Sequence, residues 1–357
     1  MEEKLRVGIL TSGGDCQALN AAMRGLVFAL YEQNPNTEII GIENGYEGLV
    51  NGSSWRLSKD DFENILSLGG TILGSSRMSF KHINDPDENG NEKIPAMIEN
   101  YKNMGLDCLV VLGGNGSQKT AKLLSEKGLN IVTLPKTIDN DVAATDLTFG
   151  YASALEVASE TIENIKTTAA SHSRIFIVEI MGHKTGHLTL NAGIAGGADV
   201  ILIPEIPFEI LSVVKKISKN ESEGRGFSII AVAEGAKSKQ DTLLSKKEYK
   251  AKMGNQSIAF QLAAQLRMIC CKEVRVSIPG HIQRGGSPCP QDRIIATRMG
   301  AAAAGYILQK KFGVMAALKN EEIVPVELSQ VAGFTKFVDA ECDTIKQAKA
   351  LGICFGD

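Results

Sequence analysis

Two aspartates separated by a single residue, Asp139 and Asp141, stand in the segment PKTIDND (135–141). Two carboxylates this close in sequence can have different roles in phosphoryl transfer. One takes the proton from an attacking hydroxyl, and the other orients that hydroxyl or serves the water shell of a metal ion. The same residue types are also typical of an Asx-rich turn that caps the next helix, so the motif alone leaves both interpretations open.

Glycine turns precede two expected helices, at Gly13-Gly14 and within VVLGGNGSQKTAKLL (110–124). Such a turn lets the free N–H groups and the positive dipole end of a helix approach a phosphate. Neither turn matches the P-loop or the dinucleotide fingerprint, and strand-to-helix turns also use glycine for steric reasons alone. Asn115 lies inside the second turn, where a metal-dependent phosphate site would more naturally place a carboxylate.

A third segment, PGHIQRGGSP (279–288), places His281 and Arg284 beside another glycine turn. The planar guanidinium of arginine matches a phosphate monoester, and a neutral imidazole can donate to one. Three more arginines are candidates of the same kind: Arg77 in GSSRMSF, Arg174 in SHSRIF and Arg275 in EVRVSI. Each of them taken alone is more often a solvated surface residue.

The elements that must position these residues alternate along the chain. Apolar runs predict strands at 5–10, 38–45, 107–114, 130–137, 174–182, 200–205 and 227–236. Periodic stretches predict helices at 21–33, 117–128, 154–171, 187–198, 210–219, 257–270 and 296–311. This alternation predicts a parallel, doubly wound α/β sheet, formed twice. Ligands bind beyond the carboxyl ends of such strands, where Gly13, Asp139 and Glu234 stand, so we expect one active site there.

Composition and charge indicate the number of domains, the kinds of partner and the cellular location. A chain of 357 residues is long enough for two domains, and a net charge of −3 without a basic run disfavours nucleic-acid and membrane partners. Seven cysteines without a C-x-x-C pair indicate reduced thiols and a cytoplasmic location. No signal peptide or membrane span is expected. The polar segments 82–95 and 237–256 are predicted to be exposed.

Several segments together resemble the 6-phosphofructokinase family, with both ATP-type and pyrophosphate-type features at the donor site. The matching segments, in family order, are GILTSGGDCQALNAAMRG, GGTILGSSR, LGGNGS, PKTIDND, GYASALEVASETI, RIFIVEIMGHKTGHLTLNAGIAGGADVILIPE, VAEG and GHIQRGGSP. The resemblance implies two Rossmann-like, doubly wound α/β domains with the active site in the cleft between them. Residues 1–150 plus about 283–333 would bind the phosphoryl donor, and 151–282 plus about 334–357 would bind fructose 6-phosphate.

The resemblance also implies a reaction, which is transfer of a phosphoryl group from ATP to the 1-hydroxyl of fructose 6-phosphate with Mg2+. Asp139 would be the base, Thr137 would hold the transferring group, and Asp141 would support the sugar. The expected sugar-phosphate ligands are Thr137, Asp139, Arg174, Met181, Gly182, His183, Glu234, Arg275, His281 and Arg284. The expected donor ligands are Gly13, Arg77, Met78, Gly113, Asn115, Gly116, Ser117 and Lys136, with Asn115 also at the metal. Arg174, counted as catalytic too, and Arg275 would come from a neighbouring subunit of a homotetramer or homodimer.

The identity of the donor depends on two positions. Gly116 stands where pyrophosphate users of the family carry an Asp, and it leaves room for the α-phosphate of ATP. Lys136 is the residue typical of pyrophosphate users, although some ATP users share it. We favour ATP because the glycine has a steric and electrostatic reason behind it.

Some residues depart from the family pattern. Asn115 replaces an Asp associated with Mg2+, and His183 replaces an Arg of the short bacterial ATP enzymes. These two replacements leave open a non-catalytic paralogue that binds sugar phosphates or serves as a regulatory subunit. Lys136 leaves open a pyrophosphate-dependent phosphofructokinase, a different donor class on the same fold.

Overall fold

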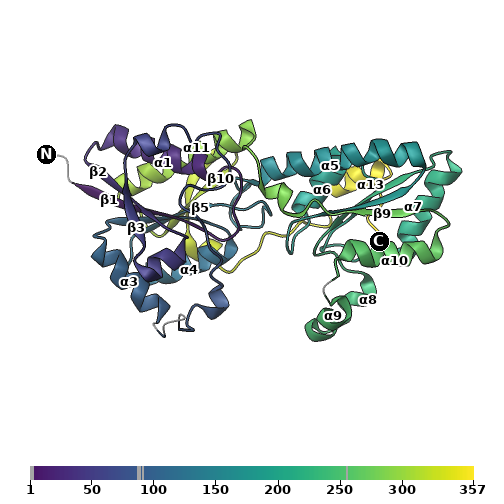
Figure 1. Ribbon diagram of the computed structural model, residues 1–357, viewed down its shortest axis with the longest axis horizontal. Helices are drawn as coiled ribbons and strands as arrows, with labels where there is room; N and C mark the ends of the chain where they lie inside the picture. Colours follow the sequence, from purple (N-terminus) through teal and green to yellow (C-terminus); the bar gives the residue numbers. More distant parts are fainter. Residues whose placement is uncertain (1–3, 87–89, 91, 255) are drawn as a thin grey trace. The chain divides into compact units, whose positions relative to one another are not determined.

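The computed structural model describes residues 4–86, 90, 92–254 and 256–357 (Figure 1). The chain divides into two compact units, each made of two stretches of sequence. Unit 1 comprises Met1–Ser153 and Arg284–Lys336, and unit 2 comprises Ala154–Gln283 and Phe337–Asp357. Which ligand each unit binds stays a prediction.

Unit 1 is built on a seven-stranded sheet in the order β11-β10-β5-β4-β1-β2-β3. The five inner strands run parallel: β10 (Val314–Lys319), β5 (Ile131–Pro135), β4 (Cys108–Gly113), β1 (Leu5–Ser12) and β2 (Thr37–Ile42). Their nearly continuous apolar sequences are buried, as expected for strands covered on both faces.

The two edge strands of this sheet, β3 (Ser54–Leu57) and β11 (Glu322–Glu327), are antiparallel to their neighbours. The expectation of an all-parallel sheet is therefore wrong at both edges. At β11 the reason is local, because Lys319 and Glu322 pair across a two-residue turn. Both turn residues, Asn320 and Glu321, have positive φ, which makes a tight hairpin and leaves no room for a crossover helix.

Helices cover both faces of the first sheet. On one face lie α1 (Leu19–Gln33) and α11 (Pro290–Leu308), and on the other lie α3 (Lys93–Asn103) and α4 (Asn115–Glu126) (Figure 1). Two glycines let α1 and α11 pack closely. A Cβ at Gly25 would lie 2.5 Å from the carbonyl oxygen of Thr297, and one at Gly300 would lie 2.2 Å from that of Ala22. The short helices α2 (Tyr46–Asn51) and α12 (Leu328–Val331) complete the unit.

Unit 2 has a four-stranded, all-parallel sheet in the order β7-β8-β6-β9. Its strands are β7 (Val200–Leu202), β8 (Ser228–Ala233), β6 (Ile175–Ile180) and β9 (Val274–Ser277). An apolar core joins one face of the sheet to α7 (Ile210–Ser222) and α10 (Ile258–Ile269). The other helices are α5 (Tyr151–His172), α6 (His187–Ala195) and α13 (Asp343–Ala350), and α5 begins with the last residues of the first stretch of unit 1.

The described part of the segment 237–256 is mostly exposed, as predicted, apart from the buried Asp241, but it is also helical. It forms α8 (Lys239–Thr242) and α9 (Lys246–Met253), and α9 has no buried residue. Ser245 and Glu248 form a capping box at the start of α9, a spacing that is visible in the sequence. Residue 255 lies outside the described residues.

The predicted surface loop 82–95 is only partly described, since residues 87–89 and 91 lie outside the described residues. Its first residue ends a 3-10 turn, Phe80–His82, and its last residues already belong to α3. Within the part of the chain that the structure describes, no helix is both long enough and apolar enough to cross a membrane.

Candidate active site

The carboxyl ends of three neighbouring strands bring the glycine turns and the aspartate motif of unit 1 together. Ser12, the last residue of β1, pairs with Gly113 of β4, and Gly113 pairs with Pro135 of β5. The residues that follow these three strands therefore start at adjacent points of one sheet edge, as expected for a doubly wound sheet.

The turn after β4 leads directly into α4, whose N-terminus has no side-chain cap. The N–H groups of its first turn are therefore available to an anion, and the helix dipole favours one. A Cβ placed at Gly116 would meet no described atom within 4 Å, so packing within the chain does not require glycine there. Gly13 differs, because its φ of 89° is one that other residues rarely adopt.

Three cationic side chains gather at Gly13-Gly14. The Lys136 ammonium donates a hydrogen bond to the carbonyl oxygen of Gly14. Nη1 of Arg284 donates to the carbonyl oxygen of Asp15 at 2.9 Å. A Cβ at Gly14 would lie 3.0 Å from that Nη1 and 3.2 Å from Nη2 of Arg77. Arg284 is an expected sugar-phosphate ligand, yet it lies beside the same turn as the expected donor ligands Lys136 and Arg77.

Lys136 is unusual because it is only 2% exposed. The pKa of its ammonium is lowered from 10.5 to about 8, mainly by burial and also by the nearby Arg284, while Asp139 and Asp15 act in the opposite direction. Burial also raises the pKa of the neighbouring Cys16 thiol to about 12, so Cys16 supplies no thiolate counter-ion at neutral pH. A buried ammonium in this setting is suited to the phosphates of a ligand.

The aspartate loop after β5 is held by Asn115. Nδ2 of Asn115 donates to Oδ2 of Asp141 at 2.8 Å and to the carbonyl oxygen of Asp141 at 3.0 Å. The backbone N–H of Asp139 donates to Oγ1 of Thr137 at 3.1 Å. Asp141 is buried and Asp139 is half-buried. The amide of Asn115 therefore faces a carboxylate, a place in which an aspartate would be repelled unless a cation or a proton lay between the two.

A cation has few protein ligands at this site. Among the described residues there is no group of three or more His, Cys, Asp or Glu side chains that could hold a metal ion. Oδ1 of Asn115 is buried and has no hydrogen-bond partner, so it offers one neutral oxygen next to the Asp141 carboxylate. These two oxygens fit Mg2+ when phosphates and water supply the remaining ligands, which is how Mg2+ is usually held.

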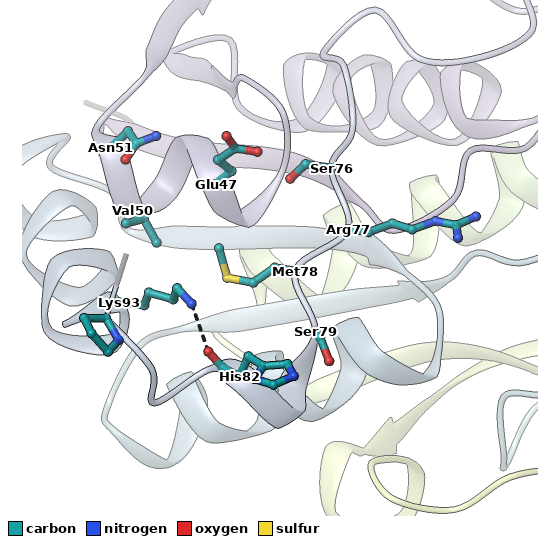
Figure 2. A pocket seen from close by; sticks show the side chains of 10 residues that line it. Glu47, Val50, Asn51, Ser76, Arg77, Met78, Ser79, His82 and Lys93 are labelled. Carbon is teal, nitrogen blue, oxygen red and sulfur yellow. Dashed lines mark hydrogen bonds between the residues drawn. The ribbon is translucent and has the colours of Figure 1, made fainter. Parts of the chain in front are cut away.

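A pocket of about 440 Å3 opens in unit 1 beside Arg77 (Figure 2). Residues 76–79 form one side, with Met78 pointing into the pocket, and Glu47 and Asn51 of α2 form another. Nζ of Lys93 donates to the carbonyl oxygen of His82 at 2.9 Å and closes the far side. Its volume and mixed lining suit a small organic ligand.

In unit 2, the carboxyl edge of the sheet gathers four of the expected sugar-phosphate residues. Met181, Gly182 and His183 follow β6, and Glu234 follows β8. Oε1 of Glu234 accepts hydrogen bonds from the backbone N–H groups of His183 at 2.7 Å and Gly182 at 3.3 Å. The exposed side chain of Glu234 is thus held at the turn after β6.

His281 follows β9 at the same edge and lies in the 3-10 turn Gly280–Arg284. Gln283 anchors this turn. Its Oε1 accepts from the N–H of Met181 at 3.2 Å, and its Nε2 donates to the carbonyl oxygen of Gly280 at 3.1 Å.

Arg174 and Arg275 lie at the opposite edge of that sheet. Arg174 directly precedes β6, and Arg275 pairs with Phe176 near the start of β9. A six-residue strand spans roughly 20 Å, so one unit 2 does not bring these arginines to Glu234. Both arginines contact Glu273, Arg174 through Nε at 2.5 Å and Arg275 through Nη2.

Four supporting residues were not singled out from the sequence: Gln283, Glu273, Lys336 and Asn140. Gln283, Glu273 and Asn140 lie one or two residues from candidates, in HIQRGG, EVR and TIDND, but nothing in their spacing indicates a partner. Lys336 is far from every motif in sequence, although its Nζ contacts the aspartate loop.

Comparison with known proteins gives one consistent family. The family described as phosphofructokinase matches residues 6–307. The ATP-dependent 6-phosphofructokinase of Spirochaeta thermophila is 47% identical, over 98% of this chain and 97% of that protein. The crystal structure of Pichia pastoris phosphofructokinase in the T-state matches with a TM-score of 0.77 at 31% identity, over 98% of this chain and 36% of that one.

A more distant structural match is the pyrophosphate-dependent phosphofructokinase of Marinobacter aquaeolei. It has a TM-score of 0.81 at 20% identity, over 99% of this chain and 92% of that one, and at this identity it shows the fold alone. The predicted family and the predicted pair of Rossmann-like folds are confirmed: the chain belongs to the phosphofructokinase family.

Proposed function

We propose that this chain is a kinase that transfers the γ-phosphoryl group of ATP to the 1-hydroxyl of fructose 6-phosphate, giving fructose 1,6-bisphosphate and ADP, a step of glycolysis. The observation that carries the proposal is the cluster of Lys136, Arg77 and Arg284 around Gly13-Gly14, at the same sheet edge as Asp139 and the start of α4. The family and the curated ATP-dependent relative support it.

The choice of ATP over pyrophosphate rests on two features of unit 1. The open space at Gly116 can receive an α-phosphate, which an Asp side chain would fill and repel. The pocket beside Arg77 and Met78 is large enough for a nucleoside, for which pyrophosphate has no counterpart. We therefore propose that the pocket holds the adenosine of ATP and that Gly13, Gly113 and Ser117 line the path of its phosphates.

The residues of unit 1 carry the chemistry. Asp139 accepts the proton of the 1-hydroxyl as the oxygen attacks the γ-phosphorus, and Thr137 donates to the transferring group. Lys136, Arg77 and the N–H groups at the start of α4 stabilise the charge that develops on the phosphate oxygens. Asp141 is fixed by Asn115 and supports the sugar.

Mg2+ would lie near Oδ1 of Asn115 and the Asp141 carboxylate, and when bound it neutralises phosphate charge. The protein offers one neutral and one charged oxygen there, so we propose that the donor phosphates and water hold most of the ion.

Unit 2 binds the sugar. We propose that Met181, Gly182, His183, Glu234 and His281, at the carboxyl edge of its sheet, contact fructose 6-phosphate. Arg284 lies beside Gly14, so we propose that it binds the sugar near the end that accepts the phosphoryl group.

The 6-phosphate requires a second copy of the chain. Arg174 and Arg275 lie roughly 20 Å from Glu234 along β6, too far to reach a sugar bound at Glu234 of the same copy. We propose that these arginines serve the site of a neighbouring subunit in a homotetramer or homodimer, without a nucleic acid or membrane partner. The seven free cysteines of this chain and its proposed substrates fit a cytoplasmic enzyme.

Parallel turnover assays test the donor. The purified chain is incubated with fructose 6-phosphate and Mg2+, with ATP in one series and pyrophosphate in the other, and fructose 1,6-bisphosphate is measured. We expect product with ATP. Product with pyrophosphate alone would replace the donor assignment, and no product with either would favour a non-catalytic paralogue.

Substitution of Gly116 by Asp tests the reason for the choice. The variant should lose ATP turnover because its side chain fills the α-phosphate space. Gly305→Asp serves as the control, because Gly305 is also a helical glycine with open space around its Cβ position and no positive φ. Equal loss in both variants would refute the steric argument.

A further inference from the structure

Lys336 connects a remote part of the sequence to the loop that carries the two aspartates. Its Nζ donates three hydrogen bonds of 2.9 Å, to Oδ1 of Asn140 and to the carbonyl oxygens of Thr145 and Asp146. Its own backbone N–H donates to the carbonyl oxygen of Asp141 at 2.8 Å. One residue thus contacts the loop at four points, and all of them lie in unit 1.

The conformation of Asn140 makes its side-chain contacts relevant to the loop. Asn140 lies between the two aspartates with a φ of 50°, a left-handed conformation that asparagine adopts more readily than most residues other than glycine. Its Oδ1 accepts from the N–H of Thr148 at 3.1 Å as well as from Lys336, and the residue is only 6% exposed. Asp139 and Asp141 are bonded directly to Asn140 in the chain, so the backbone conformation of Asn140 affects where their carboxylates lie.

Other residues hold the loop at Asp141, Thr145 and Asp146, whereas the side chain of Lys336 contacts Asn140. Asn115 holds Asp141 from the start of α4. Thr145 and Asp146 are tied to β10 and to the turn after it, through Leu318 and Asn320. Among the contacts that the structure describes for Asn140, Lys336 brings the formal charge, since Thr148 contributes a backbone N–H.

We propose that Lys336 is a positioning residue for phosphoryl transfer, which holds the Asp139-Asn140-Asp141 backbone in the geometry that the base requires. This inference rests on the proposed function, since it assigns Lys336 a part in that reaction. Lys336 is not among the residues that we propose to contact the donor or the sugar, so its effect should fall on the rate of the bound complex rather than on binding. Misplacement of a catalytic group by about 1 Å costs on the order of a hundredfold in rate.

The same geometry favours the charged form of the Lys336 side chain. Nζ contacts three acceptors. An ammonium has a hydrogen for each of them, whereas a neutral amine has only two.

The test compares Lys336→Met and Lys336→Arg with the wild-type chain, and Lys319→Met is the matched control because Lys319 is an exposed lysine of the same unit. We measure kcat and both KM values by varying each substrate while the other is saturating. Lys336→Met should lower kcat by about 10- to 100-fold and change either KM by less than about threefold. Lys336→Arg should retain most of kcat, since arginine keeps the charge and can donate several hydrogen bonds.

A second measurement does not depend on turnover. Amide hydrogen exchange of the intact chain should be faster at residues 139–148 in Lys336→Met than in the wild type, and unchanged in the control variant. Unchanged exchange there, or a wild-type kcat in Lys336→Met, would overturn the positioning role. Absence of kinase activity in the wild type, with exchange altered as expected, would instead refute the proposed function and leave the structural role of Lys336 intact.

Discussion

Replacement of the buried Lys136 by methionine is expected to stabilise the ligand-free chain and to weaken its hold on the phosphoryl donor. Lys136 is 2% exposed, and no carboxylate forms an ion pair with it among the described contacts. Methionine has a similar length and volume without the charge, so the substitution removes the ammonium and leaves the packing nearly unchanged.

The magnitude follows from the lowered pKa. A pKa of about 8, against an ordinary 10.5, corresponds to about 3 kcal/mol of cost for keeping the ammonium charged in the folded chain. Loss of the hydrogen bond to Gly14 offsets about 1 kcal/mol of the gain. At pH 7 the variant should therefore be more stable by about 2 kcal/mol, or roughly 5 °C in Tm.

The lowered pKa of Lys136 also determines how the stability difference between the wild type and Lys136→Met changes with pH. Below pH 8 the ammonium is charged in both the folded and the unfolded chain, so the wild type bears the full cost. Between pH 8 and 10.5 the folded chain releases its proton while the unfolded chain keeps it, so the wild type gains stability as pH rises. The advantage of Lys136→Met should shrink over this interval.

Thermal unfolding of both proteins from pH 7 to pH 10, with Lys127→Met as an exposed-lysine control on the same unit, provides the check. Calorimetric titration with ATP in buffers of different ionisation enthalpy adds a second one. ATP should bind at least tenfold more weakly to Lys136→Met, and its binding to the wild type near pH 8 should take up a proton. A variant that is less stable than the wild type at pH 7, or proton release on binding, would refute the account of Lys136.

Three further substitutions separate the remaining roles. Asp139→Ser should lower kcat by orders of magnitude while fructose 6-phosphate still binds in calorimetry, and retained turnover would show that Asp139 is not the base. Asn115→Asp places a second carboxylate beside Asp141, so the Mg2+ concentration for half-maximal rate should fall several-fold, and an unchanged metal requirement would contradict the site near Oδ1. Glu273→Gln removes the carboxylate that now contacts both Arg174 and Arg275, so the KM for fructose 6-phosphate should fall with kcat unchanged, whereas a higher KM would mean that Glu273 orients these arginines for the sugar.

The alternating pattern of strands and helices was predictable because each buried parallel strand is apolar throughout. The runs at β1, β4, β5, β6 and β8 correspond to strands that are buried along most or all of their length. Strands β3, β9, β10 and β11 do not appear among the predicted strands. β3, β9 and β11 are partly exposed and polar at several positions, so they lack a continuous apolar run. β10 is buried except at its last residue, but its sequence VMAALK holds two alanines, which are depleted in strands.

Site residues at strand ends were predictable for the same reason, since parallel strands deliver their following residues to one edge. The contacts between them were not. Asn115 drew attention as a replaced carboxylate at a metal site, and the structure adds that its amide faces the Asp141 carboxylate. Lys336 reaches the loop over a separation of 196 residues from Asn140, and no local pattern encodes such a contact.

Transfer of label from ATP tests the central proposal most directly. The purified chain is incubated with fructose 6-phosphate, Mg2+ and ATP that carries an isotope label in its γ-phosphate, and the products are identified by phosphorus NMR. The label should appear in the phosphate group on carbon 1 of fructose 1,6-bisphosphate, with one ADP formed for each bisphosphate. Asp139→Ser should abolish the labelled product and the ADP. Label that remains in ATP would contradict the proposed ATP-dependent transfer. This holds whether a parallel sample with pyrophosphate forms the bisphosphate or forms no product.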